Sequence, residues 1–232
     1  MTTPKPPGRP RLAATLPDAP AVLEPEGILQ DCCLEGLDAA GGTFELVEIL
    51  GVHLTGGSLA GSAWRRPVWA DVEFADVDLA NAVLTDAGWK RIALTRCRVT
   101  GADLSQAVIT DATFTDCAVN LASLRFARLT RVVFSGCRLD GADFGGAQLT
   151  DVWFDHCDLT GATFAQATTT RVRFTASRLE DLHGVESLRG STIEPRDLLD
   201  LAHLLAGALG LEVAWGQTAT EGRSRGSPCH RT

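Results

Sequence analysis

Cysteine is the residue whose spacing in this sequence most resembles a chemical site. Cys97, Cys117, Cys137 and Cys157 lie 20 residues apart, and Cys32 lies a multiple of five residues before them. Zinc sites commonly place two cysteines only a few residues apart, and stacked parallel side chains seldom meet disulfide geometry. We therefore expect buried thiols that fill space, with no metal and no redox role. Free thiols in this number favour a reducing compartment, so we expect a cytoplasmic protein.

Histidine could supply a general base, but the histidines are scattered along the chain: His53, His156, His183, His203 and His230. None has a nearby partner that suggests a catalytic triad. Glycines such as Gly101, Gly141 and Gly161 recur at the interval of a turn and do not form a phosphate-binding loop. The sequence predicts neither an enzyme nor a cofactor.

The element that positions all these residues is a five-residue repeat. From Leu29 to Leu179, 29 of the 31 residues at intervals of five are Leu, Ile, Val, Phe or Trp, and Ala39 and Thr169 are the exceptions. In an α-helix, residues five apart would point in different directions within two turns, and in a strand they would alternate between the two faces. The pattern therefore predicts a solenoid.

A second phase of the repeat, two residues before each large side chain, is small. From Val72 to Ser177 it holds only Ala, Val, Ile, Cys or Ser. A close-packed interior that takes one large and one small side chain from each side of a coil explains both phases. The other three residues of each five then face solvent.

A 20-residue period gives the size of one coil. Phe114, Phe134, Phe154 and Phe174 recur at this interval, as do the cysteines, which Ser177 follows in the same position. Four fives make one coil with four sides. Nearly eight coils stacked at the usual strand spacing make a rod of roughly 37 Å.

At this point the residues carry a family resemblance. The stretches Ala102-Asp103-Leu104-Ser105, Ala142-Asp143-Phe144-Gly145-Gly146 and Gly161-Ala162-Thr163-Phe164 resemble the pentapeptide-repeat motif A(D/N)LXX. The likeness covers about residues 28 to 182, without an insertion. It implies an all-β solenoid, a right-handed quadrilateral parallel β-helix of about eight coils.

Composition divides the chain into four segments. Residues 1–26 are expected to form a disordered or extended leader, 27–183 the coils, 184–215 a cap and dimerisation segment, and 216–232 a disordered tail. No apolar run is long enough for a membrane span, and no apolar core of a secretory signal precedes Pro17. The leader is marked by its prolines: Pro4, Pro6, Pro7, Pro10, Pro17, Pro20 and Pro25.

A single helix is predicted after the coils. Pro195 fits its first position and Gly210 fits the residue beyond its end. We expect Leu201 and Leu205 to face the last coil and Leu204 to lie in a dimer contact, with Val213 and Trp215 adding to that surface. A monomer with a thick cap is the alternative. The core-facing stripe comprises Leu198, Leu201, Ala202, Leu205 and Leu209, whereas Leu199, Leu204 and Ala208 lie off it.

The 20-residue period also sorts the charges by side. One side, called here the ladder side, alternates in sign from coil to coil and sums to zero with Asp31, Glu48, Lys90 and Arg128. Opposite charges on adjacent coils should pair, each exposed contact giving about 0 to 1 kcal/mol. We interpret this ladder as structural. It comprises Asp71, Arg91, Asp111, Arg131, Asp151 and Arg171.

The next two sides, called here the first and second acidic sides, each carry a net charge of −3. The first holds Glu35, Glu73, Asp76, Asp116 and Asp155 against Arg96 and Arg173. The second holds Asp38, Asp78, Asp140, Asp158, Glu180 and Asp181 against Arg98, Arg138 and Arg178. The candidate partner-binding residues are Glu73, Asp76, Asp116, Asp155, Asp78, Asp140 and Asp158.

Two functions remain open. The first is implied by the resemblance to pentapeptide-repeat proteins of the fluoroquinolone-resistance type, which are dimeric rods that mimic DNA and bind DNA gyrase or topoisomerase IV. Because no loop interrupts the coils here, the loopless members of this type are the closer analogue. The alternative is a passive protein-interaction scaffold. Direct nucleic-acid binding is not expected at a pI near 5.1 and a net charge of −8.

Overall fold

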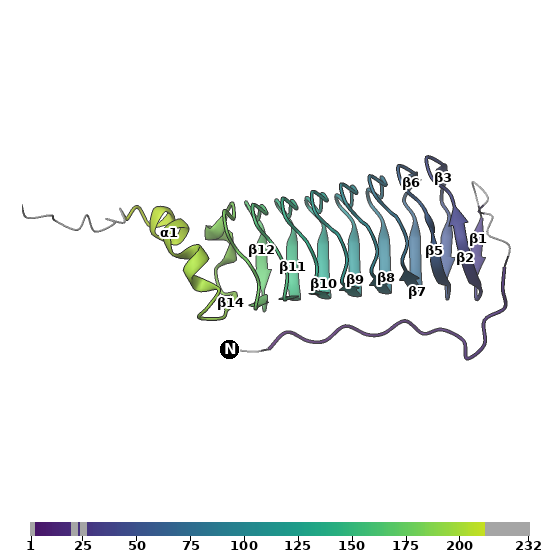
Figure 1. Cartoon of the computed structure of the whole chain (residues 1–232), viewed down its shortest axis with the longest axis horizontal. Coiled ribbons are helices and arrows are strands. Elements are labelled where there is room, and N and C mark those ends of the chain that lie inside the picture. The colour runs from purple at the N-terminus through teal and green to yellow at the C-terminus, as the bar shows by residue number, and fades with distance from the viewer. Residues whose placement is uncertain (1–2, 20–22, 24–26, 212–232) are drawn as a thin grey trace, which may run out of the picture.

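The computed structural model describes residues 3–19, 23 and 27–211, and it is a parallel β-solenoid with one C-terminal helix. Figure 1 shows the coils stacked along one axis, with α1 at one end. The strands are β1 (Ile28–Gln30), β2 (Cys33–Asp38), β3 (Thr43–Glu45), β4 (Glu48–Leu50), β5 (His53–Ser58), β6 (Ala63–Arg65), β7 (Val68–Ala75), β8 (Gly88–Thr95), β9 (Val108–Thr115), β10 (Arg128–Ser135), β11 (Gln148–Asp155), β12 (Thr168–Thr170), β13 (Arg173–Thr175) and β14 (Thr192–Ile193). A 3-10 helix (Val185–Leu188) and α1 (Leu198–Ala208) follow the coils.

The strands pair in the register that the 20-residue period predicts. Twelve of them form one parallel sheet, ordered β1-β4-β7-β8-β9-β10-β11-β13-β14 along its main path, and β3 pairs with β6. Phe114 lies opposite Phe134, and Phe134 lies opposite Phe154. Their rings stack with centroids 4.6 Å and 5.2 Å apart. The large phase of the repeat therefore fills the interior, as predicted.

The corners explain why the period is five. Every fifth residue from Asp31 to Asp181 has a positive φ, between 49° and 68°, and these residues turn the chain from one side to the next. Glycine holds such a backbone without strain, and Asp and Asn tolerate it better than other residues. The predicted corner glycines Gly101, Gly141 and Gly161 all lie in this phase.

The small phase holds the cysteines, as predicted, and they also donate hydrogen bonds. Cys137 Sγ lies 3.3 Å from the Phe114 carbonyl oxygen, and Cys157 Sγ lies 3.4 Å from that of Phe134. Ser177 takes the next position and donates its hydroxyl to the Phe154 carbonyl at 3.3 Å. A thiol or hydroxyl therefore fits this slot because it can satisfy an inward carbonyl while occupying little volume.

The helix α1 covers the last coil with a face that differs from the predicted stripe. Leu201 is fully buried, and Leu204 and Leu205 pack partly against the core. Leu201 therefore faces the coil as predicted, whereas Leu204, which was expected in a dimer contact, packs partly against the core as Leu205 does. Leu198 and Leu209 were also expected to face the coil but are 45% and 76% exposed, because they lie at the two ends of the helix.

The ends of α1 are fixed by backbone contacts. The helix begins at Leu198, three residues after Pro195, because a turn from Glu194 precedes it, with the Leu198 amide 3.2 Å from the Glu194 carbonyl. Gly210 lies beyond its end, as predicted, with φ 70°. Asp197 and Asp200 accept hydrogen bonds from the amides of Ser177 and Leu179, both at 3.2 Å, so the edge of the last coil is partly covered. Val213, Trp215 and the predicted tail lie outside the described residues.

The described part of the N-terminal leader lies along the coils. Residues 3–19 are extended and run back along the rod, from the end near α1 to the first coils (Figure 1). Near the first coils the amide of Cys33 donates to the Pro17 carbonyl, and the amide of Ala19 donates to the Cys33 carbonyl, both at 2.9 Å. The backbone of these residues therefore forms hydrogen bonds with the coils.

Candidate interaction sides of the rod

The ladder side carries three ion pairs, each joining two successive coils. Arg131 Nε and Nη2 lie 2.6 Å and 2.8 Å from the two carboxylate oxygens of Asp111. Arg171 and Asp151 repeat the geometry at 2.6 Å and 2.7 Å, and Arg91 pairs with Asp71 in the same way. The predicted pairing is therefore confirmed.

These pairs are more buried than the exposed ladder that the sequence predicts. The Asp71, Asp111 and Asp151 side chains are only 18%, 14% and 4% exposed. The hydrogen bond from the arginine of the next coil is the main cause that holds the pKa of each carboxyl below its ordinary value, against the opposing effect of burial.

The leader supplies the third contact of each carboxylate. The backbone amides of Lys5, Gly8 and Arg11 donate to the Oδ1 atoms of Asp151, Asp111 and Asp71 at 3.0, 2.9 and 2.9 Å. These contacts were not predicted from the sequence, because hydropathy and charge say nothing about a backbone amide. The spacing of the non-proline residues in the leader is the signal that could have indicated them.

The first acidic side keeps part of its charge within its own pairs. Arg96 binds Asp76 through two contacts of 2.8 Å and 2.6 Å, and this hydrogen bonding lowers the pKa of the Asp76 carboxyl. Glu73 lies 3.2 Å from His53 Nδ1. Asp155 lies 3.1 Å from His156 Nδ1.

The second acidic side has looser pairs. Asp78 lies 3.5 Å from Arg98, and Asp158 lies 3.5 Å from Arg178. Within the described part of the chain, Asp116 and Asp140 form no ion pair within 4 Å. Of the seven candidate partner-binding carboxylates, these two therefore remain available to a basic side chain of a partner. Asp116 lies at a corner of the first acidic side, and Asp140 lies next to the Gly141 corner of the second.

The thiols and the histidines do not assemble a reactive site in the described residues. Hydrogen bonding to Cys137, together with burial, raises the pKa of Cys117 to about 12. The pKa of Cys97 is raised as well, mainly by its hydrogen bond with Cys117. Such thiols stay protonated near neutral pH. No group of three or more metal-binding side chains occurs within residues 3–19, 23 and 27–211.

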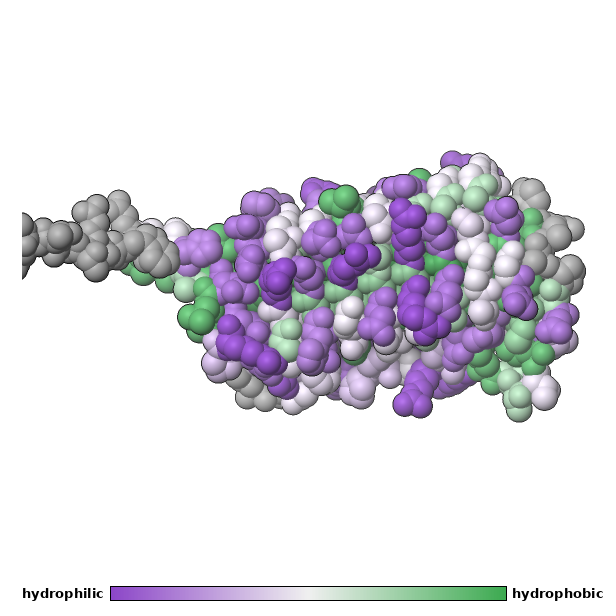
Figure 2. Space-filling view, viewed as in Figure 1, coloured by the Kyte–Doolittle hydropathy of each residue, from purple (hydrophilic) through white to green (hydrophobic). Residues whose placement is uncertain are grey.

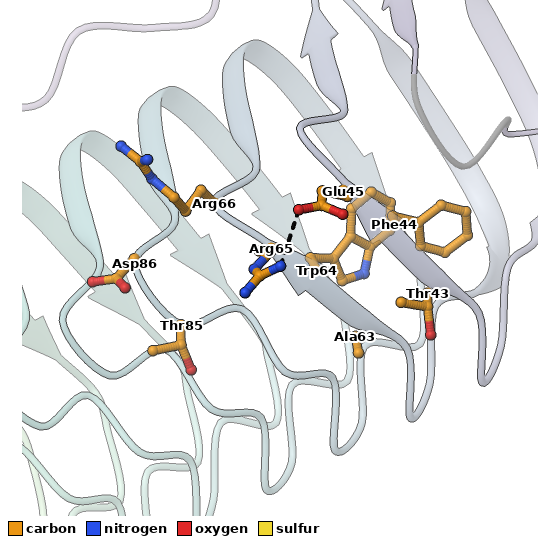
Figure 3. A pocket seen from close by; sticks show the side chains of 9 residues that line it. All are labelled: Thr43, Phe44, Glu45, Ala63, Trp64, Arg65, Arg66, Thr85 and Asp86. Atoms are coloured by element: carbon orange, nitrogen blue, oxygen red, sulfur yellow. Dashed lines mark hydrogen bonds and ion pairs between the residues drawn. The ribbon is translucent and has the colours of Figure 1, made fainter.

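The fourth side, which follows the second acidic side, has an open hollow of about 440 Å³ beside the first coils (Figure 3). Its floor contains the stacked rings of Phe44 and Trp64, with centroids 4.4 Å apart. Arg65 and Glu45 pair across it at 3.1 Å. The rest of the lining is Thr43, Ala63, Arg66, Thr85 and Asp86. Its ionisable groups are two arginines and two carboxylates, a set without a nucleophile and base in contact.

Comparison with known proteins places this geometry in a family. The family model described as "Pentapeptide repeat region" matches residues 68–144 and 121–183. No curated protein matches the chain.

Several solved structures are similar to the chain. HetL, a pentapeptide repeat protein involved in heterocyst differentiation regulation in the cyanobacterium Nostoc sp. strain PCC 7120, is 19% identical over 71% of this chain and 88% of its own, with a TM-score of 0.27. A trypsin-treated QnrB1, a plasmid-mediated fluoroquinolone resistance protein, is 17% identical over 82% of this chain and 99% of its own, with a TM-score of 0.32. A pentapeptide repeat protein from the Arabidopsis thaliana thylakoid lumen is 23% identical over 62% of this chain and 78% of its own, with a TM-score of 0.27.

The family model and the coils agree on the same repeat. The matched residues span half of the chain, from Val68 to His183, and the corner phase continues unbroken from Asp31 to Asp181. The chain therefore belongs to the pentapeptide-repeat family.

Proposed function

We propose that the protein acts without chemistry of its own, as a rigid rod whose two acidic sides enter a cationic groove built for DNA. DNA gyrase or topoisomerase IV is the proposed target, and occupation of its groove would inhibit the enzyme or protect it from a fluoroquinolone. The observation that carries the proposal is the contrast between a ladder side that the leader covers and two adjoining acidic sides that stay open.

Charge supports this use of the open sides. Each acidic side has a net charge of −3 and offers carboxylates in rows that follow the coil spacing. A groove that binds DNA is lined by basic side chains, and their contacts with phosphates dominate its affinity. Rows of carboxylates can replace phosphates there, and the open carboxylates Asp116 and Asp140 are the first candidates for contact.

A homodimer is part of the proposal, because two rods joined at α1 would lengthen the acidic surface. At the two ends of the helix, Leu198, Leu199 and Leu209 are 45%, 77% and 76% exposed. Figure 2 shows apolar side chains gathered at this end of the rod. An exposed apolar cluster of this kind is typical of a contact surface. The proposed contact therefore moves from Leu204 to these residues.

The salt dependence of binding tests the target. Labelled protein would be titrated with purified gyrase at about 50 mM and about 200 mM salt, with short duplex DNA as competitor. We expect binding that DNA displaces and that weakens about tenfold or more at the higher salt, as contacts of charge with charge do. Absence of binding at high micromolar protein at the lower salt would contradict the proposal.

A passive scaffold is the second candidate, and a specific observation favours it. Five of the seven candidate carboxylates already face a basic side chain of this chain, which reduces the field that they present to a partner. A scaffold that docks by shape would bind its partner about equally at both salt concentrations. Gyrase binding that is insensitive to salt and to DNA would favour this candidate.

A further inference from the structure

We propose that the ladder side is a recognition site for a proline-rich, basic segment in the polyproline II conformation. The leader of this chain is its resident ligand, and the same segment from a second copy can take its place. This inference goes beyond the proposed function, since it concerns the ladder side and not the acidic sides.

The first argument is a match of two repeats. A polyproline II helix advances about 3.1 Å per residue and completes one turn in three residues, so every third amide points the same way at intervals of about 9.3 Å. The carboxylates Asp71, Asp111 and Asp151 lie on alternate coils, at intervals of about 9.6 Å. Lys5, Gly8 and Arg11 are three residues apart and contact these carboxylates in order. The spacing of the carboxylates on the rod therefore matches the spacing of the donor amides in the segment over the whole contact.

The second argument is that the same contact is built three times from the same atoms. In each, the arginine of the next coil donates Nε to Asp Oδ1 and Nη2 to Asp Oδ2, and the leader amide donates to Oδ1 as well. The arginine thus fixes the orientation of the carboxylate before the segment arrives. A fixed, largely buried acceptor with a full charge gives a stronger hydrogen bond than a mobile one.

The third argument is the sequence of the leader. Proline has no amide hydrogen, and the leader places Pro4, Pro6, Pro7 and Pro10 at positions that do not donate to the ladder. Its central donor, Gly8, approaches closely, since a Cβ there would lie 3.5 Å from Asp111 Cγ, an ordinary contact that alanine can make. The charges of Lys5 and Arg11 each favour the ionised form of the carboxyl beneath. Donor spacing, prolines and charge together define the ligand class.

The test uses two full-length variants that differ only in the three amides. One carries Lys5→Pro, Gly8→Pro and Arg11→Pro, which keep the polyproline II shape and remove the donors. The matched control carries Lys5→Ala, Gly8→Ala and Arg11→Ala, which lose the same two charges and keep the donors. Equal melting curves by circular dichroism would show that the coils are intact in both.

The probe is a fluorescent synthetic peptide with the sequence of residues 3–12, followed by anisotropy. We expect it to bind the proline variant about tenfold more tightly than the alanine variant, whose own leader still occupies the ladder, as removal of a tethered competitor predicts. A peptide with prolines at the three donor positions should bind neither. Equal binding to both variants, or binding to neither, would overturn the proposal.

Amide hydrogen exchange in the unmodified protein gives a second readout. The amides of Lys5, Gly8 and Arg11 should exchange about tenfold or more slowly than those of Arg9 and Leu12, which donate to no ladder carboxylate. Equal exchange at all five would mean that the leader is not seated on the ladder, and would also overturn the proposal.

Discussion

The ladder side and the first acidic side contain the same ion pair in different surroundings. Arg131 binds Asp111, and Arg96 binds Asp76, each through Nε and Nη2 to the two carboxylate oxygens, one coil apart. On the ladder side the Asp111 side chain is 14% exposed, whereas on the acidic side the Asp76 side chain is 48% exposed. The coil geometry is the same, so the difference comes from the leader that covers one side.

Residue type and spacing alone therefore do not fix the role of a charged side chain. A carboxylate beneath the leader has all its contacts inside the molecule, and its removal leaves buried donors unpaired. A carboxylate on an open side exchanges its contacts with water and remains available to a partner. The pairs of the ladder side therefore hold successive coils together, and the open carboxylates of the acidic sides are the ones proposed to meet a partner.

The largest effect is expected in the interior that both sides share. Phe134→Ala should lower the free energy of unfolding by about 3 to 5 kcal/mol, because it removes a fully buried ring that stacks on Phe114 and Phe154. Urea denaturation followed by circular dichroism would measure it. An unchanged denaturation midpoint would mean that the ring does not lie in the interior, and would contradict the assignment of inward and outward positions on both sides.

A smaller effect should separate the two sides directly. Asp151→Ala should lower the free energy of unfolding by about 1 to 3 kcal/mol, because it leaves the guanidinium of Arg171 and the amide of Lys5 without their acceptor. Asp76→Ala, the matched change on the acidic side, should lower it by about 0 to 1 kcal/mol. Urea denaturation would again measure the loss. Equal losses of unfolding free energy in the two variants would contradict the difference between the two sides.

The dependence of stability on pH should differ between the sides as well. The arginine hydrogen bonds hold the pKa of Asp71, Asp111 and Asp151 below the ordinary value in the folded protein. Their contribution is therefore complete above the unfolded pKa, near 3.9, and is lost as the pH falls through the folded values.

The triple variant Asp71→Asn, Asp111→Asn and Asp151→Asn provides the control. Its deficit in unfolding free energy relative to the unmodified protein should be constant from about pH 7 to pH 5 and should shrink below about pH 4. Urea titrations at several pH values would measure the deficit. A deficit that stays constant down to about pH 2 would show that these carboxyls do not carry the linkage.

The smallest effect on the coils is expected at the outer face of α1. Leu199→Lys should leave the free energy of unfolding within about 0.5 kcal/mol of its value, since this side chain is 77% exposed. It should nevertheless halve the molar mass found by light scattering, because a charge would enter the proposed dimer contact. A monomeric unmodified protein would refute the dimer, while a dimeric variant would place the contact elsewhere.

The coils could be predicted from the sequence because each residue repeats one environment many times. The five-residue register gave the interior from Leu34 to Leu182, and the 20-residue period gave the pairs of the ladder. The leader could not be predicted in the same way, since its contacts use backbone amides and acceptors more than 50 residues away. The face of α1 was partly missed, because its leucines surround the helix and only the angle of docking decides that Leu204 lies inward and Leu198 outward.

Seven candidate carboxylates were predicted from the charge of each side, and the structure shows which of them already form ion pairs. Asp116 and Asp76 both occupy corner positions, but only Asp76 has an arginine on the next coil, since Gly136 follows Asp116 in that position. The sequence itself shows which corner carboxylate has an arginine 20 residues later, but the pairing can be recognised only when the corners of successive coils are aligned.

Inhibition of gyrase supercoiling by matched variants tests the central claim most directly. Asp116→Lys with Asp140→Lys reverses one open carboxylate on each acidic side, whereas Glu48→Lys with Asp86→Lys makes the same change of charge, at similar exposure, outside the acidic sides. We predict that the unmodified protein and the second variant inhibit supercoiling alike, and that the first variant requires about tenfold more protein. Equal activity of the two variants would contradict the assignment of binding to the open acidic sides.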